Sequence, residues 1–430
     1  MSGNILFLTA GFPWPPASGG DVRTLMQLKV LSSLPTVERI RFFSLHEDGV
    51  DRDATEALVR EVAKLDLCEP VFHPIHLFRH RAHVPRVVWL RIARGVPYMA
   101  AKWDSPHIRR ALVRELTREQ FDVVWINGLG MAYYLDVVRE LQPHARVVLD
   151  QQNVEHDRFV QFARRQRGLR RLVAEAEWRA ARRYERQVLL AVDAVGAISM
   201  DDAQAYREFA GIEARVVPQV APPVTHRKAE VVAGRLCWIG GLAWEPNVRG
   251  LDWFCRDVWP RVRECLPDVT LDIVGPGLPT DGGKPIPPPG WQVPGVTTIG
   301  FAPDLGPVYE RSVAMVAPIL GVTGLRIKLI EAFRHGMPFV TTPDGAAGLP
   351  LEPGREAFVE TDANAFADRV VELASSPATR ERLRESGYAF LERHNQLAAA
   401  QTADAALLGA DSTPPPTSSQ WAVASVGPVG

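Results

Sequence analysis

Two runs of alternating strands and helices, separated by a proline-rich break, constrain the fold of this chain more than any other feature. In the first run, apolar segments are predicted as strands at residues 4–9, 39–45, 121–126 and 146–150, with helical segments between them. The break is the sequence PQVAPP at residues 218–223, and a second run begins at residue 235. In this run a helix is predicted at residues 248–265, and a strand at 269–274 is followed by a long Gly/Pro loop to residue 295. Strands that alternate with helices predict parallel sheets covered by helices on both faces.

The length of 430 residues also favours two domains over one, because a single core usually stops growing well below this size. We therefore expect an α/β protein with two Rossmann-like domains that face a central cleft, at residues 1–220 and 221–395. Residues 396–410 are expected to form a terminal helix or a linker. The Pro/Ser/Thr-rich tail at residues 411–430 is expected to be disordered.

Charge and hydropathy exclude several classes of protein. The formal net charge is −1, so no nucleic-acid partner is expected. The four cysteines contain no CxxC pair, and no metal site is predicted. The apolar run at residues 5–10 is too short for a signal peptide, and no segment approaches the roughly 20 apolar residues that span a bilayer. We expect a cytoplasmic protein.

A pair of glycines follows the first predicted strand of each run. Gly19 and Gly20 precede a predicted helix in the first run, and Gly240 and Gly241 do so in the second. Backbone without Cβ can approach a ligand closely, and the amino end of a helix favours an anion. Both loops are therefore candidates for binding a phosphate. For the first loop, a plain turn capped by Asp21 is an equally open reading.

The segment at residues 323–331 is the sharpest local signal. Arg326 and Lys328 stand at the opening of a helix predicted at residues 325–335, where the helix dipole also favours anions. Arginine gives bidentate phosphate contacts and lysine a point charge. Glu331 follows one turn later, and its carboxylate could accept hydrogen bonds from both ribose hydroxyls. The alternative is an ordinary surface pair between Lys328 and Glu331.

Six pieces of the sequence, taken in order, resemble the family 4 or group 1 glycosyltransferases of the GT-B fold. They are NILFLTAGFPWPPASGGDVRT, VVLDQQNVEHDR, WIGGLAWEPNVRGLDWF, VGPG, IGFAPDL and GVTGLRIKLIEAFRHGMPFVTTPDGAAGL. The match extends from about residue 4 to about residue 395. It implies an N-terminal acceptor-side domain, a C-terminal domain that binds a UDP- or GDP-linked sugar, and transfer with retention of anomeric configuration.

The resemblance also assigns roles to residues of the second domain. It places Thr323, Gly324, Arg326, Lys328 and Glu331 at the donor, together with the four loop glycines. Arg326 and Lys328 are candidate catalytic groups, because they would neutralise the leaving diphosphate without a metal or other cofactor. Two departures stand out: Thr323 replaces a glutamate that lies near the transferred sugar in the family, and the loop at 240–247 lacks the usual basic residue.

In the first domain, the loop after the strand at 146–150 is the candidate for the acceptor or the sugar. Asn153 and Glu155 could contact sugar hydroxyls, and His156 is a candidate catalytic residue, although a lone histidine is more often structural. The NGLG sequence at residues 127–130 forms a similar loop with weaker support.

Two basic stretches raise the question of a membrane. Residues 76–114 hold nine lysines and arginines and one acidic residue, interleaved with aromatic side chains, and residues 164–186 hold nine arginines and three glutamates. Either could attract anionic lipids or a lipid-linked acceptor. For residues 76–114 peripheral membrane contact and a solvated face are equally open, whereas for 164–186 a solvated face is preferred.

The leading interpretation is a bacterial glycosyltransferase of glycan or glycoconjugate biosynthesis, with an unidentified acceptor that is a glycan or lipid-linked. The alternatives are a GT-B nucleotide-sugar epimerase, a phosphorylase, for which no pyridoxal lysine is identified, and a non-catalytic binding partner that kept the fold. Release of a nucleoside diphosphate only when an acceptor is present separates them.

Overall fold

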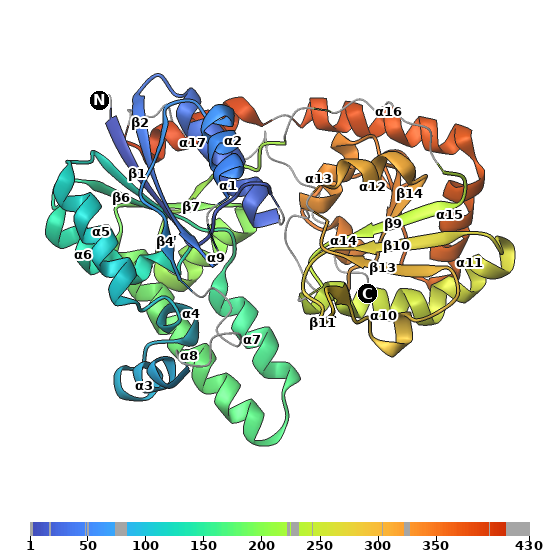
Figure 1. The fold of residues 1–430 in the computed structure, drawn as a ribbon, viewed down its shortest axis with the longest axis horizontal. Coiled ribbons are helices and arrows are strands. Elements are labelled where there is room, and N and C mark those ends of the chain that lie inside the picture. Colours follow the sequence, from blue (N-terminus) through green and yellow to red (C-terminus); the bar gives the residue numbers. More distant parts are fainter. Residues whose placement is uncertain are drawn as a thin grey trace. The chain divides into compact units, whose positions relative to one another are not determined.

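The structure is a computed structural model, and it describes residues 3–16, 19–47, 49, 51–73, 84–221, 224, 232–242, 244–302, 304–321, 327–394 and 396–409. These residues divide into two compact units. The first is formed by residues 3–16, 20–220 and 396–409, and the second chiefly by residues from 221 to 394. Both units are α/β, as the alternation of strands and helices predicts (Figure 1).

The first unit is built on a parallel sheet with the order β3-β2-β1-β5-β6-β7-β8, and the short strand β4 pairs with β2. Its strands are β1 (Gly3–Thr9), β2 (Val37–His46), β3 (Leu65–Leu67), β4 (Val71–Phe72), β5 (Val123–Asn127), β6 (Arg146–Asp150), β7 (Ala194–Ala197) and β8 (Arg215–Val216). Its helices are α1 (Gly19–Ser33), α2 (Arg52–Glu61), α3 (Val84–Arg94), α4 (Tyr98–Ala101), α5 (Pro106–Arg118), η3 (Met131–Tyr134), α6 (Leu135–Leu141), α7 (Glu155–Arg165), α8 (Gly168–Ala191) and α9 (Met200–Ala210).

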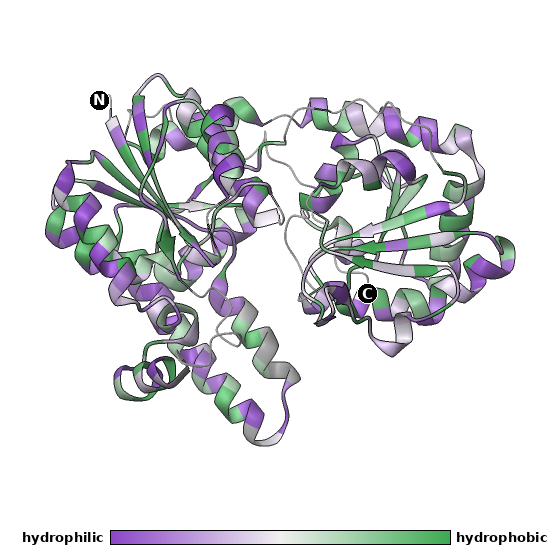
Figure 2. Ribbon diagram, viewed as in Figure 1, coloured by the Kyte–Doolittle hydropathy of each residue, from purple (hydrophilic) through white to green (hydrophobic). Residues whose placement is uncertain are grey.

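Helices cover both faces of this sheet because its inner strand β1 is apolar on both sides. Along β1, Leu6 and Leu8 pack into one core, and Ile5 and Phe7 pack into the other. Side chains of a strand alternate between faces, so a continuous apolar run must be covered twice. Figure 2 shows the resulting concentration of hydrophobic residues along the strands of both units.

The last helix, α17 (Leu397–Leu407), belongs to the first unit although it follows the second unit in sequence (Figure 1). The amide of Gln27 donates a hydrogen bond of 2.6 Å to the buried Asp404, and Arg146 Nε donates one of 2.6 Å to the carbonyl of Leu407. Burial raises the pKa of Asp404 well above its ordinary value. Residues 397–407 therefore act as a helix of the first core.

The second unit contains a six-stranded parallel sheet with the order β13-β10-β9-β14-β15-β16 and a small hairpin. The strands are β9 (Arg235–Ile239), β10 (Thr270–Val274), β13 (Val296–Gly300), β14 (Ala314–Ala317), β15 (Phe339–Thr341) and β16 (Phe358–Val359), with β11 (Thr280–Asp281) and β12 (Lys284–Pro285) in the hairpin. The remaining elements are α10 (Glu245–Trp253), η4 (Phe254–Val258), α11 (Trp259–Cys265), η5 (Pro289–Trp291), α12 (Gly306–Arg311), α13 (Ile327–Arg334), α14 (Pro343–Ala346), α15 (Ala363–Ser375) and α16 (Pro377–Arg393).

Some local expectations differ from the structure. The single helix expected at residues 248–265 begins earlier, at Glu245, and contains a π-helical turn at Phe254–Val258. Asp21 is not the N-cap of α1, because that helix already starts at Gly19 and Asp21 lies in its first turn. The loop expected to run to residue 295 contains the β11–β12 hairpin.

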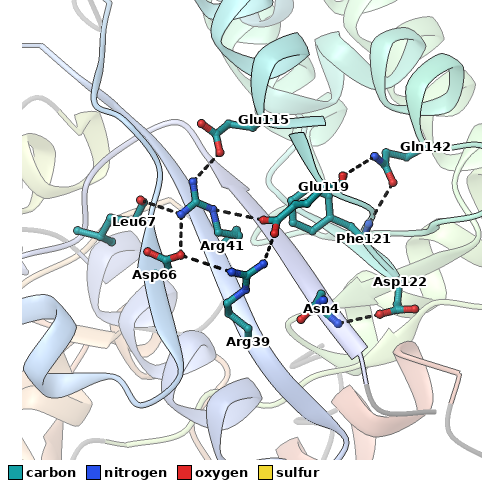
Figure 3. A network of polar contacts seen from close by, with 10 residues as sticks. All are labelled: Asn4, Arg39, Arg41, Asp66, Leu67, Glu115, Glu119, Phe121, Asp122 and Gln142. Carbon is teal, nitrogen blue, oxygen red and sulfur yellow. Dashed lines mark hydrogen bonds and ion pairs between the residues drawn. The ribbon is translucent and has the colours of Figure 1, made fainter. Parts of the chain in front are cut away.

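A buried polar network ties β2 to its neighbours in the first unit (Figure 3). Arg41 binds Glu115 of α5 at 2.6 Å and Asp66 of β3 at 2.7 Å, and Arg39 binds the more exposed Glu119. Glu115 is nearly inaccessible, so its charge depends on Arg41 for compensation. We assign this network a structural role.

Candidate functional site

The second sheet offers a ligand site where its strand order reverses. The chain runs outward from β9 through β10 to β13 and then returns to the other side of β9 as β14. The loops that follow β9 and β14 therefore leave the sheet in opposite directions at its carboxyl edge. In open parallel sheets, a crevice at this point is where ligands bind.

The glycine loop after β9 is held close to the loop after β10. A Cβ atom on Gly275, whose φ is 149°, would lie 1.8 Å from the carbonyl oxygen of Gly240. Backbone hydrogen bonds join the same loops, from Gly240 N to the carbonyl of Val274 at 3.0 Å and from Leu242 N to that of Pro276 at 2.7 Å. Glycine is thus required where the two backbones meet, and this contact fixes the position of the Gly240–Gly241 loop.

Lys328 brings a positive charge to this loop from the first turn of α13. Its Nζ donates a 2.9 Å hydrogen bond to Asn247 Oδ1 and lies 4.6 Å from the centre of the Trp238 ring. A Cβ on Gly240 would be only 3.3 Å from that Nζ. Asn247 in turn donates from Nδ2 to the carbonyl of Gly241 at 2.9 Å. The 240–247 loop contains no cation of its own, and Lys328 supplies one from a segment distant in sequence.

Glu331 lies one turn further along α13 and is largely buried. Its Oε2 accepts a 3.3 Å hydrogen bond from Arg334, while its Oε1, within the described part of the chain, is buried without a hydrogen-bond partner. Burial raises the pKa of Glu331, and the nearby Arg334 opposes this shift. A buried carboxylate oxygen with open acceptor capacity is suited to a hydroxyl donor from a ligand.

Three of the residues expected at the donor site, Thr323, Gly324 and Arg326, lie outside the described residues. The exposed surface pair considered between Lys328 and Glu331 does not describe these side chains. Lys328 binds Asn247, and Glu331 is a buried group bound to Arg334.

In the first unit, the strand order reverses between β1 and β5, and a polar cluster lies there. Asn127, the last residue of β5, donates from Nδ2 to Thr9 Oγ1 at 3.2 Å and to Thr24 Oγ1 at 2.8 Å. Thr24 donates to the carbonyl of Gly20 at 2.9 Å, and Gln152 donates to Asn127 Oδ1 at 3.1 Å. The Gly20 loop, the start of the NGLG sequence and the loop after β6 are thus connected.

His156 is buried and tightly held. Its ring Nδ1 lies 2.8 Å from Glu185 Oε2, and its ring packs 4.2 Å from that of Phe209, centre to centre. Glu185, from α8, also accepts hydrogen bonds from the backbone N–H groups of Glu155 and His156 at the start of α7. This pairing assigns the Nδ1 proton to the Glu185 contact and directs Nε2 away from it. Asn153, by contrast, has an exposed side chain.

A hollow of about 300 Å³ in the first unit was not expected from the sequence. Its lining comes from three separate segments, namely the loop after β1, the carboxyl end of β2 and the start of α2. The lining residues are Phe12, Trp14, Pro15, Leu45, His46, Glu47, Gly49, Asp51 and Ala54. The rings of Phe12 and His46 pack 5.0 Å apart, centre to centre, and burial lowers the pKa of His46. Aromatic faces beside carboxylates suit a sugar, which offers both apolar ring faces and hydroxyls.

No group of three or more His, Cys, Asp and Glu side chains that could hold a metal ion occurs among the described residues. Within that same part of the chain, none of the helices combines the length and apolarity needed to cross a bilayer.

Residues 233–376 match the family model described as Glycosyl transferases group 1. A Klebsiella pneumoniae protein, described as an uncharacterized 44.6 kDa protein in the cps region, is 20% identical over 398 residues, which cover 91% of this chain and 96% of that protein.

Solved structures resemble the whole chain. Sucrose-phosphate synthase from Thermosynechococcus elongatus has a TM-score of 0.62 at 14% identity, covering 94% of this chain and 98% of that one. S. aureus TarM, as a point mutant in complex with UDP and other ligands, has a TM-score of 0.65 at 9% identity, covering 94% and 99%. Anabaena HepE, in complex with UDP-glucose, has a TM-score of 0.60 at 12% identity, covering 95% and 100%. The chain therefore has the GT-B fold of two Rossmann-like domains.

Proposed function

Over residues 233–376 the chain belongs to the group 1 glycosyl transferases, and on this premise we propose that it transfers a sugar from a nucleotide sugar to an acceptor. The observation that best supports this proposal is the arrangement where the strand order of the second sheet reverses, between β9 and β14. There a close-packed glycine loop, a positioned lysine and a buried carboxylate lie together.

The donor diphosphate is placed over the Gly240–Gly241 loop. Lys328 contributes its charge there through Nζ, and the amino end of α13 contributes its dipole. Glu331 accepts hydrogen bonds from the ribose hydroxyls through Oε1, which has no partner among the described residues. HepE and TarM were solved with UDP-glucose or UDP, which favours a UDP-linked donor among the UDP and GDP candidates.

In this proposal the site speeds the reaction by stabilising the negative charge that develops on the leaving diphosphate. Fixed positive groups that meet this charge lower the barrier more than they stabilise the ground state. Lys328 and Arg326 have this role in our proposal, with Thr323 and Gly324 beside the donor and His156 acting from the first unit. Because these groups supply the positive charge, the reaction needs no metal or other cofactor. Retention of anomeric configuration is part of the same proposal.

The acceptor is assigned to the first unit. Asn153, which precedes α7, and Glu155, its first residue, are candidates for contacts with it. The Gly19–Gly20 loop remains a candidate for contacts with the donor. The hollow lined by Phe12, Trp14 and His46 is an additional subsite for a sugar ring. The relative from a Klebsiella cps region supports an acceptor from bacterial glycan biosynthesis.

A two-step assay tests this proposal. A thermal-shift panel of UDP-, GDP-, ADP- and dTDP-sugars first identifies the donor that stabilises the chain. Release of nucleoside diphosphate is then followed with and without glycan and lipid-linked acceptors, in the presence of EDTA. We expect release that depends on acceptor, and a product whose anomeric configuration by NMR matches that of the donor. Sugar interconversion without acceptor would instead identify an epimerase, and binding without turnover a non-catalytic protein.

A further inference from the structure

Helix α3 in the first unit is apolar on two faces, and the described residues cover only one of them. Val87 and Leu90 are buried with Ala101 in a small core. On the opposite face, Trp89 is 54% exposed and Ile92 is 80% exposed. Val88 is also exposed beside them. Such an outward face on an 11-residue helix is unusual for a surface that only meets water.

The neighbouring part of α8 also has exposed apolar side chains. Arg91 of α3 donates to Glu177 Oε2 at 2.6 Å and to the carbonyl of Ala176 at 2.7 Å, so α3 is fastened to α8. Leu172 and Val173, about one turn before this contact, are both more than half exposed. Figure 1 shows α3 and this end of α8 at the end of the first unit that points away from its sheet.

The charge of the two segments is positive. Residues 84–94 and 168–179 hold six arginines and two glutamates, which is a net charge of +4. Arg94 lies 5.4 Å from the centre of the Trp89 ring, and Arg170 and Arg171 directly precede Leu172. Arg171 and Arg179 share Glu175, with contacts of 2.8 and 3.4 Å.

We propose that this surface, formed by α3 and residues 168–179 of α8, docks the chain on a bilayer that contains anionic lipids. Exposed tryptophan and aliphatic side chains bordered by arginine are the pattern of a helix that lies in the bilayer interface. Arginine meets the lipid phosphates while the apolar side chains enter the acyl boundary. This proposal gives residues 168–179 a binding role, whereas the sequence favoured a solvated face for residues 164–186.

Co-sedimentation of the full chain with vesicles tests the docking without any nucleotide sugar, so its outcome is independent of the proposed transfer reaction. Vesicles of phosphatidylcholine alone are compared with vesicles that contain about one third phosphatidylglycerol, at low salt and at about 0.5 M NaCl, where screening is strong. We expect the chain to bind the anionic vesicles at low salt. Binding should be weaker to the neutral vesicles, and weaker to the anionic vesicles in high salt.

The variant Trp89→Ser/Ile92→Ser should lower the vesicle-bound to free ratio by about tenfold or more, because two apolar anchors are lost. The matched control is Val59→Ser/Leu190→Ser, which changes two exposed apolar residues elsewhere in the first unit and should bind like the parent chain. Thermal unfolding checks that both variants are folded.

Brominated lipids give a second readout. The chain has eleven tryptophans, so quenching of the parent is compared with that of Trp89→Phe, which keeps an aromatic anchor. We expect the quenched component to disappear in Trp89→Phe while vesicle binding remains. The proposal is overturned if the parent chain ignores anionic vesicles, if the Trp89/Ile92 variant binds as well as the parent, or if the control variant loses binding equally.

Discussion

Replacement of Lys328 by alanine should slow sugar transfer, because Lys328 carries the positive charge at the proposed donor site. The ammonium group is positioned by Asn247 at 2.9 Å and packs on the Trp238 ring, against the Gly240 loop. If the leaving diphosphate lies over that loop, Lys328 is within direct contact distance of its oxygens. Lys328→Ala removes this charge and leaves the fold of α13 intact, since alanine is a strong helix former.

The expected loss can be worked from Coulomb's law. Two unit charges about 4 Å apart attract by about 4 kcal/mol at an effective dielectric constant of 20. Part of this attraction also stabilises the bound donor before reaction, so the effect on the barrier is smaller. Loss of one oxyanion donor in other enzymes costs about 2.7–4 kcal/mol. We therefore expect kcat to fall by roughly a hundredfold or more, with a further rise in KM.

Steady-state release of nucleoside diphosphate measures both parameters. Lys284→Ala is the matched control, because Lys284 is an exposed lysine of the β11–β12 hairpin in the same unit. Asn247→Ala should slow the reaction less than Lys328→Ala, since it loosens the ammonium without removing it. A kcat near that of the parent in Lys328→Ala would mean that other groups neutralise the diphosphate and that Lys328 does not have this role.

Three further predictions concern other parts of the chain. Arg41→Ala should destabilise the first unit by about 3–5 kcal/mol in chemical denaturation, because the buried Glu115 loses the charge that compensates its own. Arg39→Ala, at the exposed end of the network, should cost less than about 1 kcal/mol. Burial raises the pKa of Asp202 to about 6, so the folded state binds this proton more tightly than the unfolded state does. The resulting contribution to the free energy of unfolding is present below about pH 4 and is lost as the pH rises through about 6. Over that pH range the free energy of unfolding of the parent should fall by up to about 3 kcal/mol relative to that of Asp202→Asn. Equal pH dependence of unfolding in the two proteins would contradict this. His156→Asn should slow transfer by about a hundredfold if Nε2 acts on the reacting groups, whereas the exposed His144→Asn should have no effect. If the His156 variant stays active and only its melting temperature falls, the residue has a packing role alone.

The elements of the fold could be predicted because their sequences contain local signals. The apolar runs of β1 and β9 and the glycine pairs that follow them predict buried strands leading into helices. Boundaries were less accurate where no local signal marks them, as at the π-helical turn Phe254–Val258.

The parts of the candidate site that depend on distant residues could not be predicted. Asn247 and Lys328 are 81 residues apart, and nothing in either segment indicates that they are hydrogen-bonded. Glu185 stands in an arginine-rich helix that resembles a solvated one, yet it is buried against His156. The hollow beside Phe12 and His46 likewise comes from three segments that contain no common motif.

Calorimetric titration of UDP, GDP, ADP and dTDP into the parent chain and Glu331→Ala measures whether a nucleoside diphosphate binds beside Lys328 and Glu331. We expect at least one nucleotide to bind the parent. Glu331→Ala should bind that nucleotide at least about tenfold more weakly, because hydrogen bonds to a charged acceptor contribute about 1.5–3 kcal/mol each. The exposed Glu352→Ala should bind as the parent does. Binding should also weaken on acidification toward the raised pKa of Glu331, since the carboxylate is the accepting form. If none of the four nucleotides binds, or if a folded Glu331→Ala binds as tightly as the parent, the assignment of this site is contradicted.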